Sequence, residues 1–259
     1  MIDTHCHIIY GVDDGSRSLE ESMKMVEIYL ANGFTKTIAT SHFDRSRYMV
    51  DPDEIREKAA ILNAEIAKRS MDFKIYPGHE IQVEPNTVKL INDGSLNKLA
   101  DSRYVLLELP FMNKALFLKD LIFNIQLEGL VPIIAHAERY AYVKENPDYL
   151  LDFIKMGALI QVNYSSIVSS QRTTRTLLER NMVHFLGTDA HQSEWRSPNI
   201  KDEKREIIDI IGEDKFNILS QTNPQKILDD EYIGSGYDQI KEAKKKKKSI
   251  FDFWRKKWN

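Results

Sequence analysis

The chain has 259 residues, a length that a single α/β barrel commonly reaches. Its only cysteine, Cys6, excludes an internal disulfide and favours a reducing compartment. The sequence starts without the apolar run of a signal peptide, and it has no stretch of about 18 apolar residues that could cross a bilayer. We therefore expect a cytoplasmic protein.

The net charge of −3 hides two differently charged parts. Residues 241–259 carry nine lysines and arginines against two acidic residues, a local charge of +7, and the other 240 residues carry −10. An acidic body argues against nucleic acid binding, and therefore against a nuclease. We expect one catalytic domain over residues 1–240 and a basic, aromatic C-terminal tail over 241–259.

Apolar runs alternate with helical patterns along the body of the chain. Ser18 and Glu21 have the spacing of a capping box, which predicts a helix start there. In chain order we predict an apolar strand at 1–4, a helix at 18–33, a strand at 36–40, a helix at 52–70, a strand at 73–76 followed by a Pro77-Gly78 turn, a strand at 104–109, a helix at 113–128, and strands at 131–135, 158–162 and 184–186. Short apolar strands separated by helices indicate a parallel sheet covered on both faces.

Histidines and acidic residues recur where these strands end: His5, His7, His42, Glu80, Glu108, His136, Asp189 and His191. The carboxyl ends of parallel barrel strands converge on one face, so these side chains should meet there, and a barrel is favoured over an open sheet. The i, i+2 pairs His5/His7 and Asp189/His191 each present two ligands on one side of an extended segment. Imidazole and carboxylate ligands without thiolate suit Mn, Fe or Zn, and the carboxylates suffice for more than one ion.

Other residues with catalytic potential are interpreted as structural. His79 should point away from Glu80, and His184 begins a strand instead of ending one. Cys6 is expected to be a small buried residue, because the loop of a cysteine-based phosphatase would need arginine at the position of Val12. No Asp-x-Asp motif stands after a strand in the place of an aspartyl nucleophile. The expected nucleophile is therefore a metal-activated water.

Several short motifs extend this pattern from Met1 to about Leu228. They are Met-Ile-Asp-x-His-x-His at 1–7, Asp13-Asp14-Gly15, Glu20-Glu21-Ser22, Thr40-Ser41-His42, Gly78-x-Glu80, Glu108-Leu109-Pro110, Ala135-His136-x-Glu138-Arg139-Tyr140 and Thr188-Asp189-Ala190-His191. On these motifs the sequence resembles the polymerase and histidinol phosphatase (PHP) superfamily. Within it, the sequence is similar to the manganese-dependent bacterial protein-tyrosine phosphatases of capsule and exopolysaccharide operons, the CpsB/YwqE type. The resemblance implies a single-domain α/β fold, the distorted (β/α)7 TIM-like barrel of the PHP type.

The resemblance also implies up to three divalent ions, with Mn²⁺ expected and Fe or Zn as alternatives. One ion would be held by His5, His7, Glu80 and Asp189, a second by Glu80, Glu108 and His136, and a third by Asp14, His42 and His191. The choice of Asp14 over Asp13 rests on the resemblance alone.

The same resemblance predicts that Arg139 and Arg196 bind the substrate phosphate. A planar guanidinium can donate two parallel hydrogen bonds to phosphate oxygens. The two arginines form the predicted catalytic set together with His42. An alternative for Arg139 is a helix cap or a pair with Glu138. Trp195 stands where relatives often have glycine, and its ring could pack against a phosphotyrosine.

The implied activity is hydrolysis of phosphotyrosine by in-line attack of metal-bound hydroxide. The expected substrate is the tyrosine-rich tail of a bacterial tyrosine kinase that drives capsular or exopolysaccharide synthesis. A homo-oligomer is expected from some relatives, with the helix that carries Glu20-Glu21-Ser22 as one contributor. The basic tail, with Lys244 to Lys248 ahead of aromatic residues, could bring the protein to the inner face of the membrane, or it could be a solvated terminus.

Two other functions remain open. The first is a PHP phosphatase of a small molecule such as histidinol phosphate. The second is a non-catalytic, metal-stabilised scaffold that binds a kinase.

Overall fold

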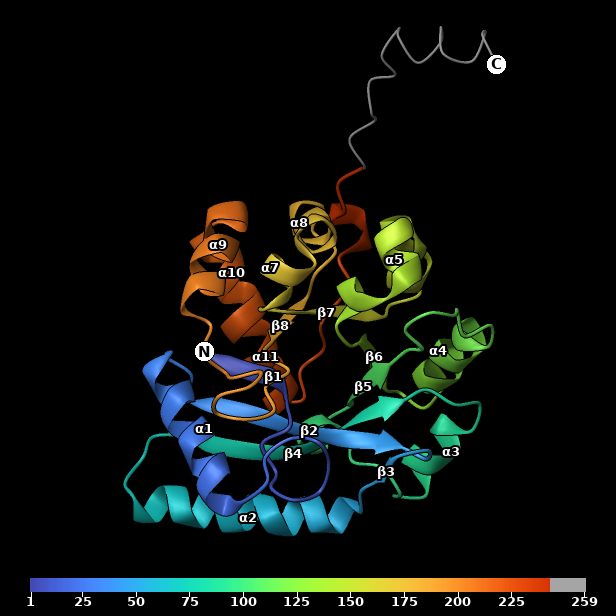
Figure 1. Ribbon diagram of the computed structural model, residues 1–259. Helices are drawn as coiled ribbons and strands as arrows, with labels where there is room; N and C mark the ends of the chain where they lie inside the picture. Colours follow the sequence, from blue (N-terminus) through green and yellow to red (C-terminus); the bar gives the residue numbers. More distant parts are fainter. Residues whose placement is uncertain (243–259) are drawn as a thin grey trace, which may run out of the picture.

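Seven parallel strands form the centre of residues 1–242, the part of the chain that the computed structural model describes (Figure 1). Their order in the sheet follows the order in the chain: β1 (Ile2–Cys6), β2 (Lys36–Asp44), β4 (Lys74–Gln82), β5 (Tyr104–Glu108), β6 (Val131–Ile134), β7 (Leu159–Asn163) and β8 (Phe185–Gly187). The two-residue strand β3 (Tyr48–Met49) pairs antiparallel with the end of β2.

The last strand returns to the first. Beyond β8, Ala190 forms a parallel bridge with Cys6, and the backbone N–H of His7 donates to the carbonyl of Ala190 at 2.8 Å. The N–H of Asp189 donates to the carbonyl of His5 at 2.7 Å. The sheet is therefore nearly closed into a barrel, which confirms the predicted fold class.

Helices connect the strands and cover the outside of the barrel (Figure 1). They are α1 (Leu19–Ala31), α2 (Pro52–Lys68), α3 (Thr87–Asn92), α4 (Leu118–Leu127), α5 (Ala141–Glu145), α6 (Leu151–Lys155), α7 (Ser166–Ser169), α8 (Gln171–Glu179), α9 (Lys201–Ile211), α10 (Glu213–Asn217) and α11 (Asn223–Leu228). α2 shows why such segments fold: Asp51 caps it, Pro52 opens it, and its buried residues Ile55, Ala59, Leu62 and Ile66 recur at helical spacing. Within the described residues, no helix is both long and apolar enough to cross a bilayer.

Two predicted boundaries were wrong. Pro77-Gly78 is not a turn, because β4 continues through both residues while pairing with Ala39 and Thr40 of β2. A Cβ on Gly78 would lie 3.1 Å from side-chain atoms of Ile38 and Leu99, so the glycine is explained by close packing.

The helix predicted from residue 113 begins only at Leu118. Its buried positions, Leu118, Leu121, Ile122 and Ile125, start there, whereas Met112 and Leu116 are exposed. Residues 109–117 instead form a loop beside the carboxyl end of β5.

The longer strands have a direct consequence for the candidate ligands. β2 extends to Asp44, and its pairing with β4 sets His42 directly opposite Glu80. Two side chains predicted on separate loops are thus fixed in register by a parallel ladder.

The predicted division of the chain at residue 240 stays a prediction. Of the basic segment 241–259, residues 243–259 lie outside the described residues.

Candidate metal centre

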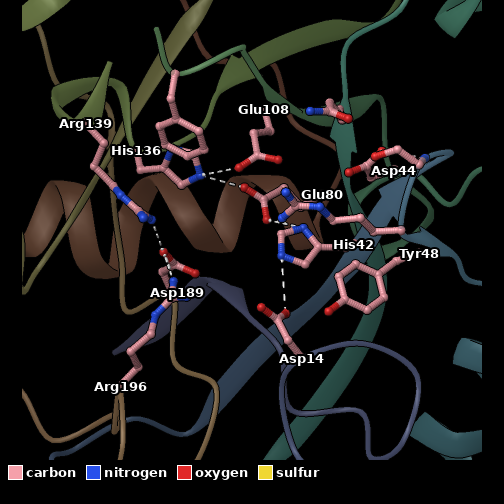
Figure 2. Close-up of a pocket in the computed structure, with 14 residues that line it drawn as sticks. Asp14, His42, Asp44, Tyr48, Glu80, Glu108, His136, Arg139, Asp189 and Arg196 are labelled. Atoms are coloured by element: carbon pink, nitrogen blue, oxygen red, sulfur yellow. Dashed lines mark hydrogen bonds and ion pairs between the residues drawn. The ribbon is translucent and has the colours of Figure 1, made fainter. Parts of the chain in front are cut away.

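All nine predicted ligands meet at the carboxyl ends of the strands. Figure 2 shows those that line the cavity above the cluster: Asp14, His42, Glu80, Glu108, His136 and Asp189. β1, β2, β4 and β5 carry His5, His42, Glu80 and Glu108, whereas His7, Asp14, His136, Asp189 and His191 follow the strand ends in loops. The strand-end pattern therefore predicted the position of the cluster correctly.

In the first expected ligand set, both histidines lie close to both carboxylates. The Nε2 atoms of His5 and His7 lie 3.3 and 3.5 Å from Oε2 of Glu80. They lie 3.6 and 3.4 Å from Oδ1 of Asp189. These four atoms can converge on one ion.

The other two sets adjoin the first. Nε2 of His136 lies 2.7 Å from Oε1 of Glu80 and 3.5 Å from Oε1 of Glu108. On the other side, Oδ1 of Asp14 lies 3.5 Å from Nε2 of His42 and 3.4 Å from Nε2 of His191. Glu80 uses both carboxylate oxygens and so connects the first two sets.

Three buried atoms of the first ligand set lack hydrogen-bond partners, Nε2 of His5, Nε2 of His7 and Oε2 of Glu80, and Nδ1 of His136 in the second set lacks one as well. Buried polar groups are nearly always hydrogen-bonded, and exceptions call for an explanation such as an ion. Here the three atoms face one another, and they are the donor types that Mn, Fe and Zn accept. The residues present therefore fit a metal ion.

Polar residues behind the cluster orient the ligands, and the sequence interpretation missed them. Nδ1 of His7 donates to Oδ2 of Asp13 at 2.9 Å, and Nδ1 of His5 donates to Oε1 of Gln161 at 3.2 Å. Each hydrogen bond leaves the Nε2 lone pair available for a metal, as is common for ligating histidines.

β7 contributes orienting side chains without providing a ligand. Gln161 and Asn163 lie two residues apart and share one face of the strand; the amide of Gln161 donates to Asn163 at 2.8 Å. Asn163 in turn donates to Oδ2 of Asp189 at 2.8 Å, and Oε1 of Gln161 accepts the backbone N–H of His136 at 2.7 Å. Two polar residues at alternate positions of an apolar run were the sequence signal for this role.

The Asp13-Asp14-Gly15 segment is fitted tightly against the end of β1. A Cβ on Gly15 would lie 2.2 Å from the carbonyl oxygen of His7, so only glycine fits there. The N–H of Gly15 donates to Oδ1 of Asp13 at 3.0 Å, and Oδ2 of the same carboxylate also accepts the N–H of His42 at 3.0 Å. Asp13 therefore organises the loop while Asp14 faces the cluster.

Backbone strain is concentrated at the same place. His136, Asp189 and Arg196 have φ values of 28°, 53° and 49°, in the left-handed region that residues other than glycine seldom adopt. Such strain is typical of functional sites.

Both predicted arginines reach the cluster and contact the same carboxylate. Nη1 of Arg139 donates to Oδ2 of Asp189 at 2.8 Å, and Nη2 of Arg196 pairs with that oxygen as well. Figure 2 shows Asp189 between the two guanidinium groups. The alternative pair of Arg139 with Glu138 does not form, because the buried Glu138 accepts the backbone N–H of Asn163.

The pKa values within the cluster shift in both directions. Those of His191 and Asp189 favour the forms that bind metal, whereas, against the lowering effect of burial, nearby carboxylates raise the pKa of His136 to about 10 and that of His7 well above its usual value. Burial and the neighbouring His7 lower the pKa of His191 to about 4, so this imidazole is neutral at pH 7. Burial opposes ionisation of Asp189, but His5, His7 and Arg196 hold the pKa of its carboxyl well below the usual value. A neutral imidazole and an anionic carboxylate are the forms that bind metal.

A cavity of about 320 Å³ opens over the cluster. Its lining residues are Asp14, His42, Asp44, Ser46, Arg47, Tyr48, Glu80, Gln82, Glu108, Phe111, His136, Arg139, Asp189 and Arg196. Both arginines and six of the nine candidate ligands thus line one open space.

Trp195 does not line this cavity. Its ring lies edge-on to His191 at 6.0 Å and beneath the guanidinium of Arg196 at 5.5 Å. The structure therefore gives this side chain contacts with Arg196 and His191, and the idea that it packs on a substrate ring is not supported.

The residues interpreted as structural have structural contacts. Cys6 is fully buried, its Sγ lies 3.0 Å from Oγ1 of Thr37, and burial raises the pKa of its thiol to about 12. His79 uses both ring nitrogens, toward the carbonyl of Val50 and the N–H of Asn97. The Sγ atom of Cys6 and both ring nitrogens of His79 are thus engaged in structural contacts, and neither residue lines the cavity.

Comparison with known proteins agrees with this geometry. The family model of CpsB/CapC, capsular polysaccharide synthesis, matches residues 1–229. The chain is 32% identical over 202 residues to the tyrosine-protein phosphatase YwqE of Bacillus subtilis (strain 168), covering 76% of this chain and 80% of that protein.

Solved structures give the same relationship. The structure of YwqE from Bacillus subtilis and CpsB from Streptococcus pneumoniae, metal-dependent tyrosine phosphatases, matches with a TM-score of 0.86 and 29% identity over 90% of this chain and 96% of that chain. Histidinol phosphate phosphatase from Lactococcus lactis matches with a TM-score of 0.54 and 16% identity over 85% of this chain and 94% of that one, and so shares the fold. The resemblance inferred from the motifs is confirmed. The chain belongs to the CpsB/CapC family of capsular polysaccharide synthesis.

Proposed function

We propose that this protein is a metal-dependent protein-tyrosine phosphatase. The observation that carries the proposal is the meeting of two arginines with a His/Asp/Glu cluster around one cavity. The cluster accounts for metal binding, and the arginines account for an anionic substrate. Its relatives YwqE and CpsB are named as tyrosine phosphatases, which supports the choice of phosphotyrosine.

We assign the nine ligands to three divalent ions, with Mn²⁺ as the expected metal and Fe or Zn as alternatives. His5, His7, Glu80 and Asp189 would hold one ion, and Glu80, Glu108 and His136 a second. Asp14, His42 and His191 would hold the third. When bound, such ions polarise phosphoryl oxygens and make a nucleophilic water available near neutral pH.

The protein's own residues bind and orient the phosphate. Arg139 and Arg196 direct their guanidinium groups to the same edge of the cluster, where they can neutralise phosphoryl oxygens. Asp189 is at once a candidate ligand and the partner of both arginines, so it couples phosphate binding to the metal centre. Asp13 and Gln161 keep His7 and His5 in the tautomers that ligation requires.

His42 has a second role in this proposal. Its imidazole lies at the cavity surface between Asp14 and Glu80, and it is the one cluster histidine that is partly exposed, at 17% of its side chain. It is therefore placed to hand a proton to the departing tyrosinate through solvent.

The expected physiological substrate is the phosphotyrosine-bearing tail of a bacterial tyrosine kinase that drives polysaccharide export. The capsular synthesis description of the family supports this choice.

We also propose that the basic tail 241–259 brings the protein to the inner face of the membrane, on its composition alone. Pelleting with anionic liposomes, with and without residues 244–259, tests that part; equal pelleting would rule it out. Homo-oligomer formation stays a prediction.

The test of the activity is a substrate comparison at saturating Mn²⁺. We expect the protein to hydrolyse a phosphotyrosyl peptide and p-nitrophenyl phosphate at least tenfold faster, in kcat/KM, than histidinol phosphate. A preference for histidinol phosphate would identify a small-molecule phosphatase instead. Binding of the peptide without metal-dependent turnover would favour the scaffold function.

A further inference from the structure

Two phenyl rings interrupt the otherwise polar wall of the cavity. Tyr48 and Phe111 line it, and every other lining residue is charged or carries a hydrogen-bonding side chain. Phe111 leaves 37% of its surface exposed, although nearby apolar residues such as Leu109 are buried. The Phe111 ring contacts the buried Tyr140 at a centroid distance of 5.6 Å, and it also lines the polar cavity.

Each ring is held against a ligand of the cluster. Phe111 stacks on His136 with centroids 5.5 Å apart and an interplanar angle of 19°. Tyr48 stacks on His42 at 5.6 Å and 12°. Phe111 also lies beneath the guanidinium of Arg139 at 5.1 Å.

The backbone fixes both rings in place. Tyr48 belongs to β3 and pairs with Asp44 of β2, and β2 is also the strand that carries His42. The carbonyl of Phe111 accepts the N–H of Ala141, which ties the loop after β5 to the segment that carries Arg139. Preorganised aromatic surfaces of this kind bind at low entropic cost.

The rings lie at two ends of the ligand cluster. Figure 2 shows Tyr48 beside His42 at one end and His136 with Arg139 at the other. Both rings line the cavity that Arg139 and Arg196 line, and Phe111 lies directly against Arg139.

We propose that Tyr48 and Phe111 are specificity-determining residues that offer the aryl group of the substrate an aromatic surface to stack on, so that the cavity selects aryl over alkyl phosphates. The inference rests on the proposed phosphatase function and names its source of selectivity. A purely polar phosphate ester, such as that of serine or of a sugar, would leave both rings without an apolar partner. An aryl ester can stack on them, and each aromatic contact strengthens binding by about two- to tenfold.

The test measures ground-state binding with phosphonates that cannot be hydrolysed. Phenylphosphonate, methylphosphonate and inorganic phosphate are titrated calorimetrically into Mn²⁺-loaded protein. Wild type should prefer phenylphosphonate over methylphosphonate. Tyr48→Leu and Phe111→Leu should each weaken phenylphosphonate binding about fivefold, and the double variant more than tenfold. Methylphosphonate and inorganic phosphate should change less than about twofold.

Matched controls separate recognition from structural damage. Phe123 on α4 and Tyr232 are 55% and 65% exposed and do not line the cavity over the cluster. Phe123→Leu and Tyr232→Leu should keep the aryl preference. Tyr48→Phe and Phe111→Tyr keep a ring and should also keep it, and bound manganese should match wild type throughout.

Two outcomes would overturn the inference. One is an aryl preference that survives the double variant. The other is an equal loss of all three ligands, which would show that the rings only position His42 and His136. Failure of the proposed function looks different: an intact aryl preference without metal-dependent hydrolysis of any phosphate ester.

Discussion

Four of the seven histidines of the chain show two ways in which ring nitrogens are used. His79 and His184 use both nitrogens on backbone partners, His184 on the N–H of Ile160 and the carbonyl of Ser235. His5 and His7 instead use Nδ1 on an orienting side chain and leave Nε2 without a partner. An unpaired, buried Nε2 thus marks His5 and His7 as ligands, whereas His191, whose two nitrogens contact the carbonyl of Asp189 and the guanidinium of Arg196, is a candidate by its place in the cluster.

The chemistry is concentrated at one end of the barrel. The carboxyl ends carry the unpaired nitrogens, the positive φ values of His136 and Asp189, and both arginines. His184 precedes β8 at the other end, where its ring contacts the N–H of Ile160 and the carbonyl of Ser235. His79 adjoins Glu80 on β4, so structural histidines occur beside the ligand cluster as well.

The largest expected effect comes from removing the ligand that connects two sets. Glu80→Gln should lower kcat/KM for a phosphotyrosyl peptide by more than about 100-fold, because even indirect partners of a metal ligand are worth about 10- to 100-fold. Bound manganese should fall with it, as measured by elemental analysis. Glu57→Gln, on the exposed side of α2, is the matched control. Full activity and full metal content in Glu80→Gln would remove Glu80 from the centre.

A loss of activity without a loss of metal is expected where phosphate, and not metal, is bound. Arg196→Lys should reduce kcat by about 10²- to 10³-fold, because a lysine cannot reproduce the forked hydrogen bonds of guanidinium. Metal content should stay at the wild-type level, unlike that of Glu80→Gln. Arg205→Lys, exposed on α9, serves as the control. If Arg196→Lys lost metal and activity in parallel, Arg196 would act by holding Asp189 and not by binding phosphate.

Much of the fold and of the centre could be predicted from the sequence, because ligand residues at strand ends and i, i+2 pairs are local patterns. His42 and Glu80 were predicted as ligands and the structure brings them together, but their exact opposition across β2 and β4 depends on strand register, which no local pattern reveals. Gln161 lies far from His5 in the sequence, so its contact with that ligand is visible only after the barrel closes. Phe111 was not singled out, because its contacts with His136 and Arg139 join the loop after β5 to the segment after β6, and no local pattern predicts them.

An orienting residue should have an intermediate effect. Asp13→Asn removes the charge that accepts from Nδ1 of His7, and we expect about a 10- to 100-fold loss in manganese affinity. Activity should recover in part at high Mn²⁺, which a removed ligand would not allow. Asp209→Asn, exposed on α9, is the control. An unchanged metal affinity would mean that His7 is oriented without Asp13.

The smallest effect concerns the structural group. Burial lowers the pKa of His184 to about 4, below the ordinary value of 6.5. The folded protein then binds fewer protons than the unfolded chain between these pH values, so stability is complete above pH 6.5 and falls as the pH drops toward 4. Between pH 7 and 5.5, His184 should account for a loss of about 1 kcal/mol in unfolding free energy.

Urea unfolding of wild type and His184→Asn at the two pH values measures this contribution. The variant should be less stable at pH 7 but lose less on acidification. Equal losses in both proteins would show that His184 titrates normally in the folded state.

The most direct test of the metal-dependent phosphatase is a titration of metal-free protein with Mn²⁺, following bound metal and phosphotyrosyl-peptide hydrolysis together. We predict no hydrolysis without metal, activity that rises as the sites fill, and saturation at no more than three ions per chain. Full hydrolysis by protein that a chelator has stripped of metal would contradict the function proposed for the cluster.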